Sequence, residues 1–241
     1  MLTNHVEVKI DVARYWDKRS ESYDNSPSHT GMPEVWKQIL SSIFKKESRI
    51  LDIGTGTGFL AVLLAELGHE VVGIDISSGM LKIAKSKSKN SKISFNLGDA
   101  ENLPFADNSF DATICRHVFW TLPNPDKALS ECYRVIKNGG KAVIIDGTWN
   151  SSATLKIKSF IGKLGIAVTE RRNPWKRYPL KSPLRELSVS SYANMIRDAG
   201  FKRVYMHDLS WLRKIIVEKS FFHRLAWSSK SYFILEAFKE V

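Results

Sequence analysis

The apolar residues of this chain follow two patterns that alternate through its central part. Short runs of Val, Ile and Leu indicate buried strands, and stretches with apolar residues three and four positions apart indicate helices. Because the two kinds of segment alternate, neighbouring strands are joined by crossovers, which predicts a parallel sheet. Strands are predicted near residues 49–53, 70–75, 93–97, 111–116 and 141–146, and helices near 58–67, 78–87 and 125–136.

Two helices are predicted before this alternating region. Residues 12–23 and 34–44 both carry apolar side chains at helical spacing. Between them, residues 24–33 are rich in Asn, Ser, Pro and Gly, which predicts a loop. We therefore interpret residues 1–48 as an N-terminal helical unit in front of an α/β core at 49–150.

The pattern loosens after the fifth predicted strand and later becomes regular again. Residues 151–188 combine prolines, aromatic residues and many Lys and Arg, and we interpret them as a basic aromatic cap inserted over the carboxyl edge of the sheet. Residues 189–241 then complete the core. Their predicted elements are a helix at 189–199 that ends at Gly200, a sixth strand at 202–207, a helical cap segment at 211–227 and a seventh, antiparallel strand at 231–238.

The composition is that of a globular protein with reduced cysteines. A length of 241 residues suffices for one α/β domain with a sizeable core, and 43% hydrophobic with 25% charged residues is ordinary for such a domain. No apolar run reaches the roughly 18 residues of a membrane span, and residues 1–10 contain no hydrophobic signal core. Cys115 and Cys132 have neither CxxC nor metal-ligand spacing. We therefore expect a cytoplasmic location and no disulfide or zinc site.

The net charge of +11 is concentrated in one part of the chain. Residues 151–230 carry 17 Lys and Arg against 5 Asp and Glu, whereas the rest of the chain carries 19 against 20. A positive field favours an anionic partner, such as a charged metabolite, nucleic acid or a membrane surface. A solvated basic face that serves solubility is the alternative.

A glycine-rich turn, Gly54-Thr55-Gly56-Thr57-Gly58, follows the first predicted strand. Glycines let the backbone approach a ligand closely, and the next helix directs free N–H groups at it. A dinucleotide-binding turn would read GxGxxG, but Phe59 stands directly after the third glycine of this GxGxG turn. Asp52, two residues before the turn, would repel a pyrophosphate and attract an ammonium group. The turn thus favours an adenosine ligand that bears an amino acid.

Two further acids stand at the ends of the next strands. Asp75 ends the second strand, where a carboxylate accepts both hydroxyls of a ribose. Asp99 follows the third strand and is placed to accept the exocyclic amino group of adenine, with the Ala100 amide facing a ring nitrogen. Each acid has a structural alternative, because Asp75 could cap the helix that begins near Ser77 and Asp99 could close a turn after Gly98.

As a set, these motifs resemble the class I S-adenosylmethionine-dependent methyltransferases, and within them the small-molecule group of ubiquinone and menaquinone biosynthesis. The resemblance is carried by LDIGTGTG (51–58), GID (73–75), GDAENLPF (98–105), NSFD (108–111) and RVIKNGG (134–140). It covers about the central two-fifths of the chain. One departure is Asn138, where the group usually has proline before the paired glycines.

The resemblance implies a Rossmann-like α/β fold: a seven-stranded, mostly parallel sheet with an antiparallel last strand, helices on both faces and a small cap. It implies S-adenosyl-L-methionine as cofactor, S-adenosyl-L-homocysteine as product and no metal. The N-terminal helices would close over the cofactor, with Tyr23 against its methionine carboxylate or, alternatively, packed between two helices. The expected cofactor-binding residues are Tyr23, Asp52, Gly54, Thr55, Gly56, Asp75, Ile76, Met80, Asp99, Ala100 and Arg116.

The methyl acceptor is expected beside the loop that follows the fourth strand. His117 is our candidate for a general base there, with a hydrogen-bonded packing role as the alternative. Arg116 could also pair with an anionic substrate or bind loop carbonyls, and Asp146 could face the site or cap a turn. The residues expected at the acceptor are Trp120, Trp149, Arg171, Arg172 and Trp175, because aromatic and basic side chains are interleaved there.

We therefore expect an enzyme that methylates a small, anionic metabolite by in-line transfer. An RNA or protein methyltransferase is one alternative, supported by the basic second half, although no RNA-binding module is evident and nucleic acid is not favoured as partner. A cofactor-binding regulatory protein without catalysis is another. The sequence contains no transmembrane segment and predicts no oligomeric state.

Overall fold

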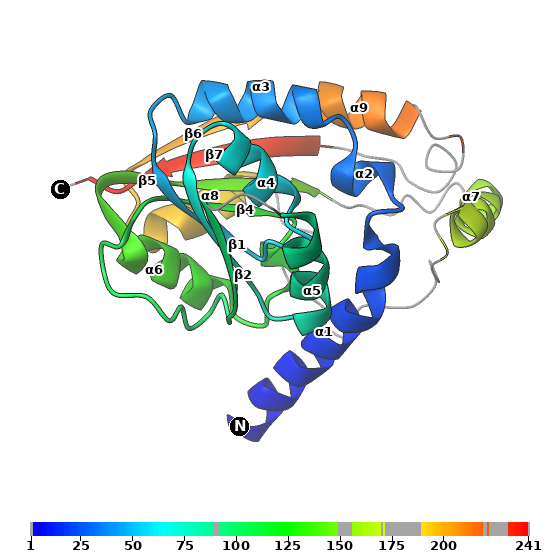
Figure 1. The fold of residues 1–241 in the computed structure, drawn as a ribbon, viewed down its shortest axis with the longest axis horizontal. Coiled ribbons are helices and arrows are strands. Elements are labelled where there is room, and N and C mark those ends of the chain that lie inside the picture. Colours follow the sequence, from blue (N-terminus) through cyan, green and yellow to red (C-terminus); the bar gives the residue numbers. More distant parts are fainter. Residues whose placement is uncertain are drawn as a thin grey trace.

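A computed structural model describes residues 2–88, 92–148, 156–169, 171, 189–218, 221 and 231–240 of the chain. Its centre is a seven-stranded sheet in the order β3-β2-β1-β4-β5-β7-β6, covered by helices on both faces (Figure 1). The strands are β1 Arg49–Ile53, β2 Glu70–Asp75, β3 Ile93–Leu97, β4 Phe110–Arg116, β5 Ile136–Thr148, β6 Arg203–Asp208 and β7 Ser231–Phe238.

Helices lie on both faces of the sheet, while the helix Lys156–Thr169 stands apart from it in this view (Figure 1). In chain order they are α1 Leu2–Tyr23, α2 Pro27–Thr30, α3 Pro33–Ile43, α4 Phe59–Glu66, α5 Ser78–Lys87, the 3-10 turn η1 Phe119–Thr121, α6 Pro125–Val135, α7 Lys156–Thr169, α8 Val189–Asp198 and α9 Ser210–Glu218. One face of the sheet packs against α3, α4, α5 and α9 around Trp36 and Leu64. The other face packs against α6 and α8 around Leu129 and Phe233.

The strand directions confirm the predicted fold class. Strands β1 to β5 pair in parallel, and β7 is antiparallel to both of its neighbours, β5 and β6. Ile50 and Leu51 belong to opposite cores because successive side chains of a strand point to opposite faces. Both faces are covered, which explains why these strands read as continuous apolar runs rather than as alternating ones.

The strand order also locates the crevice in which this kind of sheet binds ligands. From β1 the chain builds outward through β2 and β3 on one side, and then returns to add β4 and β5 on the other. The helices that follow β1 and β4 consequently lie on opposite faces of the sheet. That reversal point leaves an open crevice at the tip of β1, which is where the glycine turn begins.

Several predicted bounds differ from the structure. The first helix begins at Leu2 rather than residue 12, and the predicted loop at 24–33 contains the short helix α2. Strand β5 begins at Ile136 rather than 141, because the glycine pair after Asn138 forms an irregularity inside the strand, where the register with β4 shifts. The predicted helical segment at 211–227 corresponds to α9 up to Glu218, and most of its remainder lies outside the described residues.

Helix α1 lies against the α/β body along α5, with its N-terminal end projecting away (Figure 1). The Asp17 carboxylate accepts hydrogen bonds from the Ser77 hydroxyl at 2.6 Å and from the Gly79 amide at 2.8 Å. These donors belong to the first turn of α5 and its N-cap, whose free N–H groups attract a carboxylate. These two hydrogen bonds fix α1 against the start of α5.

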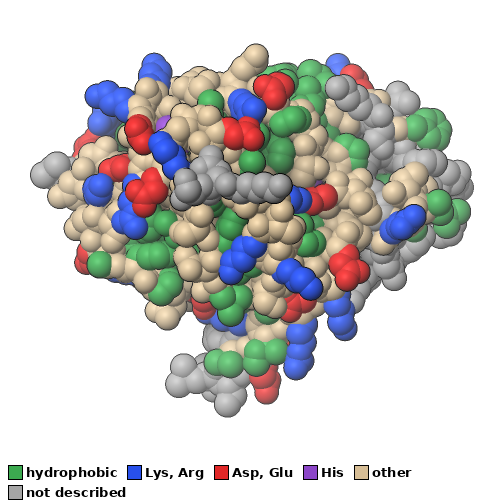
Figure 2. Space-filling view, in the orientation of Figure 1, with side chains coloured by type: hydrophobic (Ala, Val, Ile, Leu, Met, Phe, Trp, Pro, Cys, Tyr) green, Lys and Arg blue, Asp and Glu red, His purple; other side chains and the backbone are tan. Residues whose placement is uncertain are grey.

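The surface seen in Figure 2 carries Lys, Arg, Asp and Glu side chains that are interspersed rather than gathered into one patch. Within the described part of the chain, no helix combines the length and the apolar character that crossing a membrane requires.

Candidate functional site

A pocket opens at the carboxyl edge of the sheet, between α1, the glycine turn and the loops that follow β2, β3 and β4. Residues that are far apart in the sequence meet there because parallel strands present their carboxyl ends at the same edge. The structure brings ten of the residues predicted for the site to its wall. They are Tyr23, Gly54, Gly56, Asp75, Ile76, Met80, Asp99, Ala100, Arg116 and His117.

The glycine turn forms the floor of the pocket, and its conformation explains the glycines. Gly54 and Gly56 have φ angles of 64° and 56°, in the left-handed region that side chains disfavour. A Cβ atom on Gly54 would lie 2.4 Å from a methyl carbon of Val118. A Cβ on Gly56 would meet no protein atom closer than 4.0 Å, so it would extend into the space of the pocket. The turn therefore leaves room for a ligand at backbone distance.

Asp75 holds the two sides of the crevice together. Its carboxylate accepts hydrogen bonds from the Gly56 amide at 2.8 Å and from the Ser77 amide at 2.9 Å. The predicted cap contact with Ser77 is thus present, and the same carboxylate also lines the pocket. Burial raises the pKa of Asp75 to about 6, although the two amide hydrogen bonds oppose the shift.

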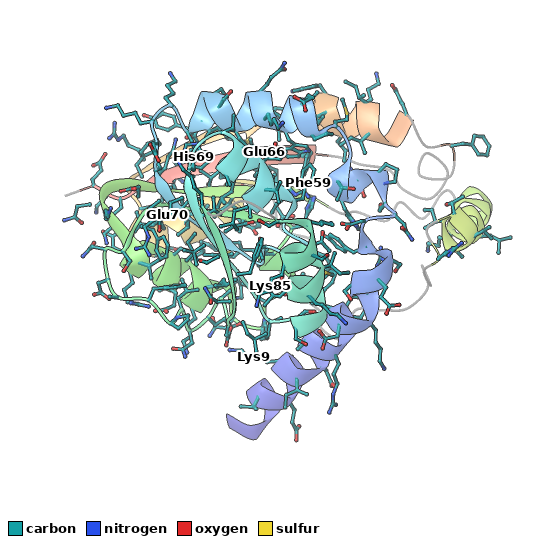
Figure 3. All side chains as sticks on the ribbon, in the orientation of Figure 1. Lys9, Phe59, Glu66, His69, Glu70 and Lys85 are labelled. Carbon is teal, nitrogen blue, oxygen red and sulfur yellow. The ribbon has the colours of Figure 1, made fainter. Side chains whose placement is uncertain are left out.

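Asp99 lies at the opposite end of the pocket and is engaged by the N-terminal helix. Its Oδ1 accepts the Glu101 amide at 2.9 Å, which closes the predicted turn, and its Oδ2 lies 2.7 Å from Lys9 Nζ. Lys9 also lies 2.7 Å from the Glu101 carboxylate. Figure 3 labels Lys9 on α1, beside the α/β body. One lysine thus neutralises two acids at the rim.

Asp52 and Thr55, both predicted to bind the cofactor, are not among the residues that line the pocket. The Asp52 side chain is buried, and it accepts a hydrogen bond from Thr55 Oγ1 at 2.7 Å. Burial raises the pKa of Asp52 to about 7, although the Thr55 hydrogen bond opposes the shift. The structure therefore places this pair beneath the glycine turn rather than at its exposed face.

Arg116 brings a buried positive charge to the pocket. Its guanidinium lies over the rings of Phe59 and Trp36, 4.8 and 5.1 Å from their centroids. One nitrogen, Nη2, donates to the His29 carbonyl, which is the carbonyl contact considered from the sequence. The other, Nη1, is buried and has no hydrogen-bond partner among the residues that the structure describes. A buried cationic donor of this kind favours an anionic group of a ligand.

Tyr23 closes the pocket beside Arg116 and the glycine turn. Its ring stacks on His29 at 3.9 Å between centroids, and its backbone carbonyl lies 2.7 Å from His29 Nδ1. The adjacent Asp24 accepts a hydrogen bond from Thr57 Oγ1 at 2.6 Å and pairs with Lys87. Tyr23 therefore both packs between two helices and lines the site, so the two alternatives from the sequence are compatible.

His117 stands directly after β4 and lines the pocket. Its Nδ1 lies 3.5 Å from Asp146 Oδ1, and its Nε2 lies 3.4 Å from Tyr232 Oη. The Asp146 side chain is buried and also accepts a hydrogen bond from Tyr192 Oη at 3.2 Å. Asp146 accepts the Gly147 amide as well, at 2.8 Å, but both residues lie within β5 and Asp146 is not among the residues that line the pocket, so its contact with the site is through His117.

Sequence reasoning expected Tyr23 of α1 at the pocket but missed three further residues of this helix. Lys9, Val12 and Trp16 form the outer wall of the pocket, and Glu101 adds a second acid at the rim. The spacing of three and four positions between these α1 residues places them on one helix face, and this signal was available in the sequence. It was overlooked because the helix was predicted to begin at residue 12.

The predicted acceptor residues are only partly described. Trp120 is half-buried and packs edge-to-face against Trp16, with 6.5 Å between ring centroids, but it is not among the residues that line the pocket. Arg171 is exposed, with a φ angle of 50°, and also does not line the pocket. Trp149, Arg172 and Trp175 lie outside the described residues. Across the part of the chain that is described, no three His, Cys, Asp or Glu side chains form a group suited to a metal ion.

Comparison with known proteins agrees with this geometry. Residues 51–144 match a family described as a methyltransferase domain. A demethylmenaquinone methyltransferase from Paenarthrobacter aurescens is 39% identical over 211 residues, which cover 83% of this chain and 82% of that protein. A ubiquinone/menaquinone biosynthesis C-methyltransferase, UbiE, from Rhizobium leguminosarum is 31% identical over 220 residues, with 80% and 82% covered.

Solved structures share the fold. A phosphoethanolamine N-methyltransferase from Haemonchus contortus, solved with S-adenosylhomocysteine, superposes with a TM-score of 0.68 at 21% identity; it covers 97% of this chain, which spans 59% of that one. A methyltransferase structure from Bacillus halodurans gives a TM-score of 0.59 at 21% identity, with 85% and 99% covered. Together with the curated relatives and the pocket, these comparisons lead to one conclusion. The chain belongs to the class I S-adenosylmethionine-dependent methyltransferases, in the ubiquinone/menaquinone-biosynthesis group.

Proposed function

We propose that this enzyme transfers the methyl group of S-adenosylmethionine to a ring carbon of a small quinol of the demethylmenaquinone type. The observation that carries the proposal is the similarity to a demethylmenaquinone methyltransferase over 83% of the chain at 39% identity. Its support within the molecule is a pocket whose acids stand at the tip of β2 and after β3, while Arg116 ends β4 and His117 follows it. The acceptor bears an acidic hydroxyl group on the ring.

The cofactor lies along the carboxyl edge of the sheet in this proposal. Asp75 accepts the ribose hydroxyls, and Asp99 with the Ala100 amide holds the adenine, whose flat faces contact Ile76 and Met80. Gly54 and Gly56 approach the methionine portion. Asp52 and Thr55 support the turn from beneath, because their mutual hydrogen bond is buried there.

Arg116 and Tyr23 bind the methionine carboxylate. The support is the buried Nη1 of Arg116, which faces no acceptor within the described residues. A carboxylate in front of it would accept a charge-assisted hydrogen bond and would neutralise the guanidinium. Phe59 and Trp36 restrict the guanidinium from both sides, so little side-chain entropy is lost when the ligand binds.

The bound donor supplies an electrophilic methyl group, so the protein contributes mainly position and exclusion of water. The wall formed by Val12 and Trp16 excludes water from the outer side of the pocket. His117 accepts the hydroxyl proton of the acceptor, which makes the ring carbon nucleophilic. Trp149, Arg171, Arg172 and Trp175 select the acceptor in this proposal, and Trp120 supports the wall through its contact with Trp16.

The proposal is tested by measuring binding and transfer separately. Titration calorimetry with S-adenosylhomocysteine should show binding that Asp75→Ala and Asp99→Ala each weaken by about 10-fold or more, since each removes an acceptor for a polar ligand group. Wild-type affinity in both variants would contradict the cofactor pose.

Transfer is then followed with a radiolabelled methyl donor and a reduced short-chain demethylmenaquinone. We expect the label in the quinol, where mass spectrometry should locate the added methyl group on a ring carbon. Asp75→Ala should transfer no label at the same donor concentration. Label recovered instead in RNA or protein from an added cell extract would favour the alternative classes of methyltransferase and refute the quinol.

A further inference from the structure

A chain of four polar side chains lies beside the pocket, at the carboxyl ends of β4 and β5 and the amino end of the antiparallel strand β7. Tyr192 Oη donates to one oxygen of Asp146 at 3.2 Å, and the other oxygen of Asp146 lies 3.5 Å from His117 Nδ1. On the far side, His117 Nε2 lies 3.4 Å from Tyr232 Oη, and the two rings are stacked at 5.4 Å between centroids. The Asp146 side chain is 2% exposed, and that of His117 is 11% exposed.

A buried carboxylate and a histidine at a positive φ angle each cost folding free energy, which suggests that the arrangement serves a function. A carboxylate that is fully buried requires donors, and Asp146 receives them from Tyr192 and from the Gly147 amide. His117 has a φ angle of 61°, a conformation that non-glycine residues rarely adopt, and its amide donates to the Ile145 carbonyl at 2.9 Å. Strained residues of this kind cluster at functional sites. Here the strain turns the imidazole from the end of β4 toward β5.

The imidazole is surrounded by charged and titratable side chains on several of the elements packed around it. Burial lowers the pKa of His117 below its usual value, Asp146 on β5 opposes this shift, and Arg116 on β4 and Arg213 on α9 add to it. Tyr232 on β7 is a neutral neighbour at ordinary pH, because burial raises its pKa to about 12. Tyr192 on α8 reaches the imidazole through Asp146, and His29 on α2 is half-buried with its own pKa lowered well below the usual value, chiefly by desolvation. Asp146 therefore faces His117 with a negative charge that stabilises an imidazolium.

We infer that Asp146 is the positioning residue for His117: its carboxylate orients the imidazole and stabilises the imidazolium that forms when His117 takes the hydroxyl proton of the acceptor. The 3.5 Å separation is too long for a good hydrogen bond in the free protein, and such contacts in active sites shorten when the ligands bind. Tyr192 donates one hydrogen bond to the carboxylate, the Gly147 amide donates another, and Tyr232 stacks on the imidazole ring. The inference rests on the proposed function in one respect, namely that the acceptor carries an acidic hydroxyl group.

The proton transfer balances as follows. The O–H bond of the acceptor breaks, and an N–H bond forms on the imidazole. The electron pair left on oxygen moves through the ring to the carbon that bonds to the methyl group, while the sulfur–methyl bond breaks and its pair stays on sulfur. Loss of that carbon's own proton restores the aromatic ring, and the imidazolium returns its proton to the oxygen. One proton leaves for each methyl group transferred.

The first test needs no substrate. The imidazole resonances of the complex with S-adenosylhomocysteine are followed by NMR as the pH is varied, and His117 is assigned by its absence in His117→Gln. Asp146→Asn removes the charge with little change in shape and should lower the pKa of His117 by about 1 unit. Tyr192→Phe is the matched control, because it removes a contact of Asp146 but leaves the carboxylate, and it should not lower that pKa.

An unchanged pKa in Asp146→Asn, or an equal fall in Tyr192→Phe, would overturn the inference, because the shift would then be absent or would reflect loosened packing. If Asp146→Asn does not fold, the pKa of His117 in Tyr192→Phe serves as the test. With one hydrogen bond fewer, the carboxylate stabilises the imidazolium at least as well as before. A fall of the His117 pKa in that variant would contradict the assignment.

The second test uses turnover with the reduced quinol. Asp146→Asn should lower the plateau of kcat by about 10-fold or more, and should move the acid limb of the pH profile downward by the same shift that NMR reports. Its affinity for S-adenosylhomocysteine should stay within about twofold of wild type, and a larger loss would overturn a positioning role. If the wild-type enzyme does not methylate the quinol, the proposed acceptor fails, while the NMR result still decides the pairing of Asp146 with His117.

Discussion

The contact of Lys9 with Asp99 and Glu101 predicts that α1 is held over the cofactor pocket by one side chain. Lys9 Nζ lies 2.7 Å from each carboxylate, and the Glu101 side chain is only 3% exposed. Burial by itself would lower the pKa of Lys9, but the hydrogen bonds to Asp99 and Glu101 outweigh it and raise that pKa. The perturbation we choose is Lys9→Met, which keeps the aliphatic stem and removes the charge.

The magnitude follows from the partners that remain. A hydrogen bond between charged groups contributes about 1.5–3 kcal/mol, and solvent screening reduces this for Lys9 and Asp99, whose side chains are 24% and 29% exposed. Glu101 keeps the Asn124 amide as a donor at 2.7 Å, so its charge is not left wholly uncompensated. We therefore expect Lys9→Met to weaken the docking of α1 by about 2 kcal/mol, or roughly 30-fold in the ratio of docked to undocked helix.

Hydrogen exchange of the α1 amides, followed by mass spectrometry, measures this ratio. Peptides that span Lys9 to Asp17 should exchange roughly 30-fold faster in Lys9→Met. Adding Glu101→Gln to Lys9→Met should restore about 1 kcal/mol of the docking free energy, because the amide no longer buries an unpaired charge. Lys9→Arg, which keeps the charge, is the control. Exchange at the wild-type rate in Lys9→Met, or equal acceleration in Lys9→Arg, would refute the reasoning.

Two further predictions concern Arg116, which lines the pocket, and Asp52, which lies beneath the glycine turn. Arg116→Gln should weaken the binding of S-adenosylhomocysteine by about 10- to 100-fold. It should leave the affinity for 5′-methylthioadenosine, which lacks the amino-acid carboxylate, as in wild type. Calorimetry that finds the same loss of affinity for both ligands would argue against a carboxylate contact. Asp52→Asn should raise the melting temperature at pH 8 but not at pH 4. The reason is that burial raises the folded pKa of Asp52 to about 7, above the unfolded value of about 3.9. Its ionisation therefore costs the native state roughly 4 kcal/mol, a cost that grows as the pH rises through that interval. A melting-temperature difference that does not vary with pH would count against this account of Asp52.

The order of the central elements and most of the pocket could be predicted from the sequence, because both depend on local patterns. Buried parallel strands require continuous apolar runs, and a sheet of this kind presents every carboxyl end at one edge. Asp75 and Asp99 could therefore be assigned to a common site although 24 positions separate them. The glycine turn carried its own signal, since its backbone needs left-handed φ angles that glycine tolerates.

What the sequence could not determine depended on contacts between distant side chains. Asp52 was expected at the ligand because it precedes the glycine turn, but strand position does not say whether a side chain faces the pocket or the support beneath it, and the bond to Thr55 places it beneath. Lys9 and Trp16 became part of the pocket only because Asp17 docks α1 on the first turn of α5. The pairing of His117 with Asp146 likewise arises from the packing of β4 against β5 and from a strained backbone angle. Local pattern thus determined which elements form, whereas the orientation of each polar side chain was decided by the neighbour that tertiary packing placed beside it.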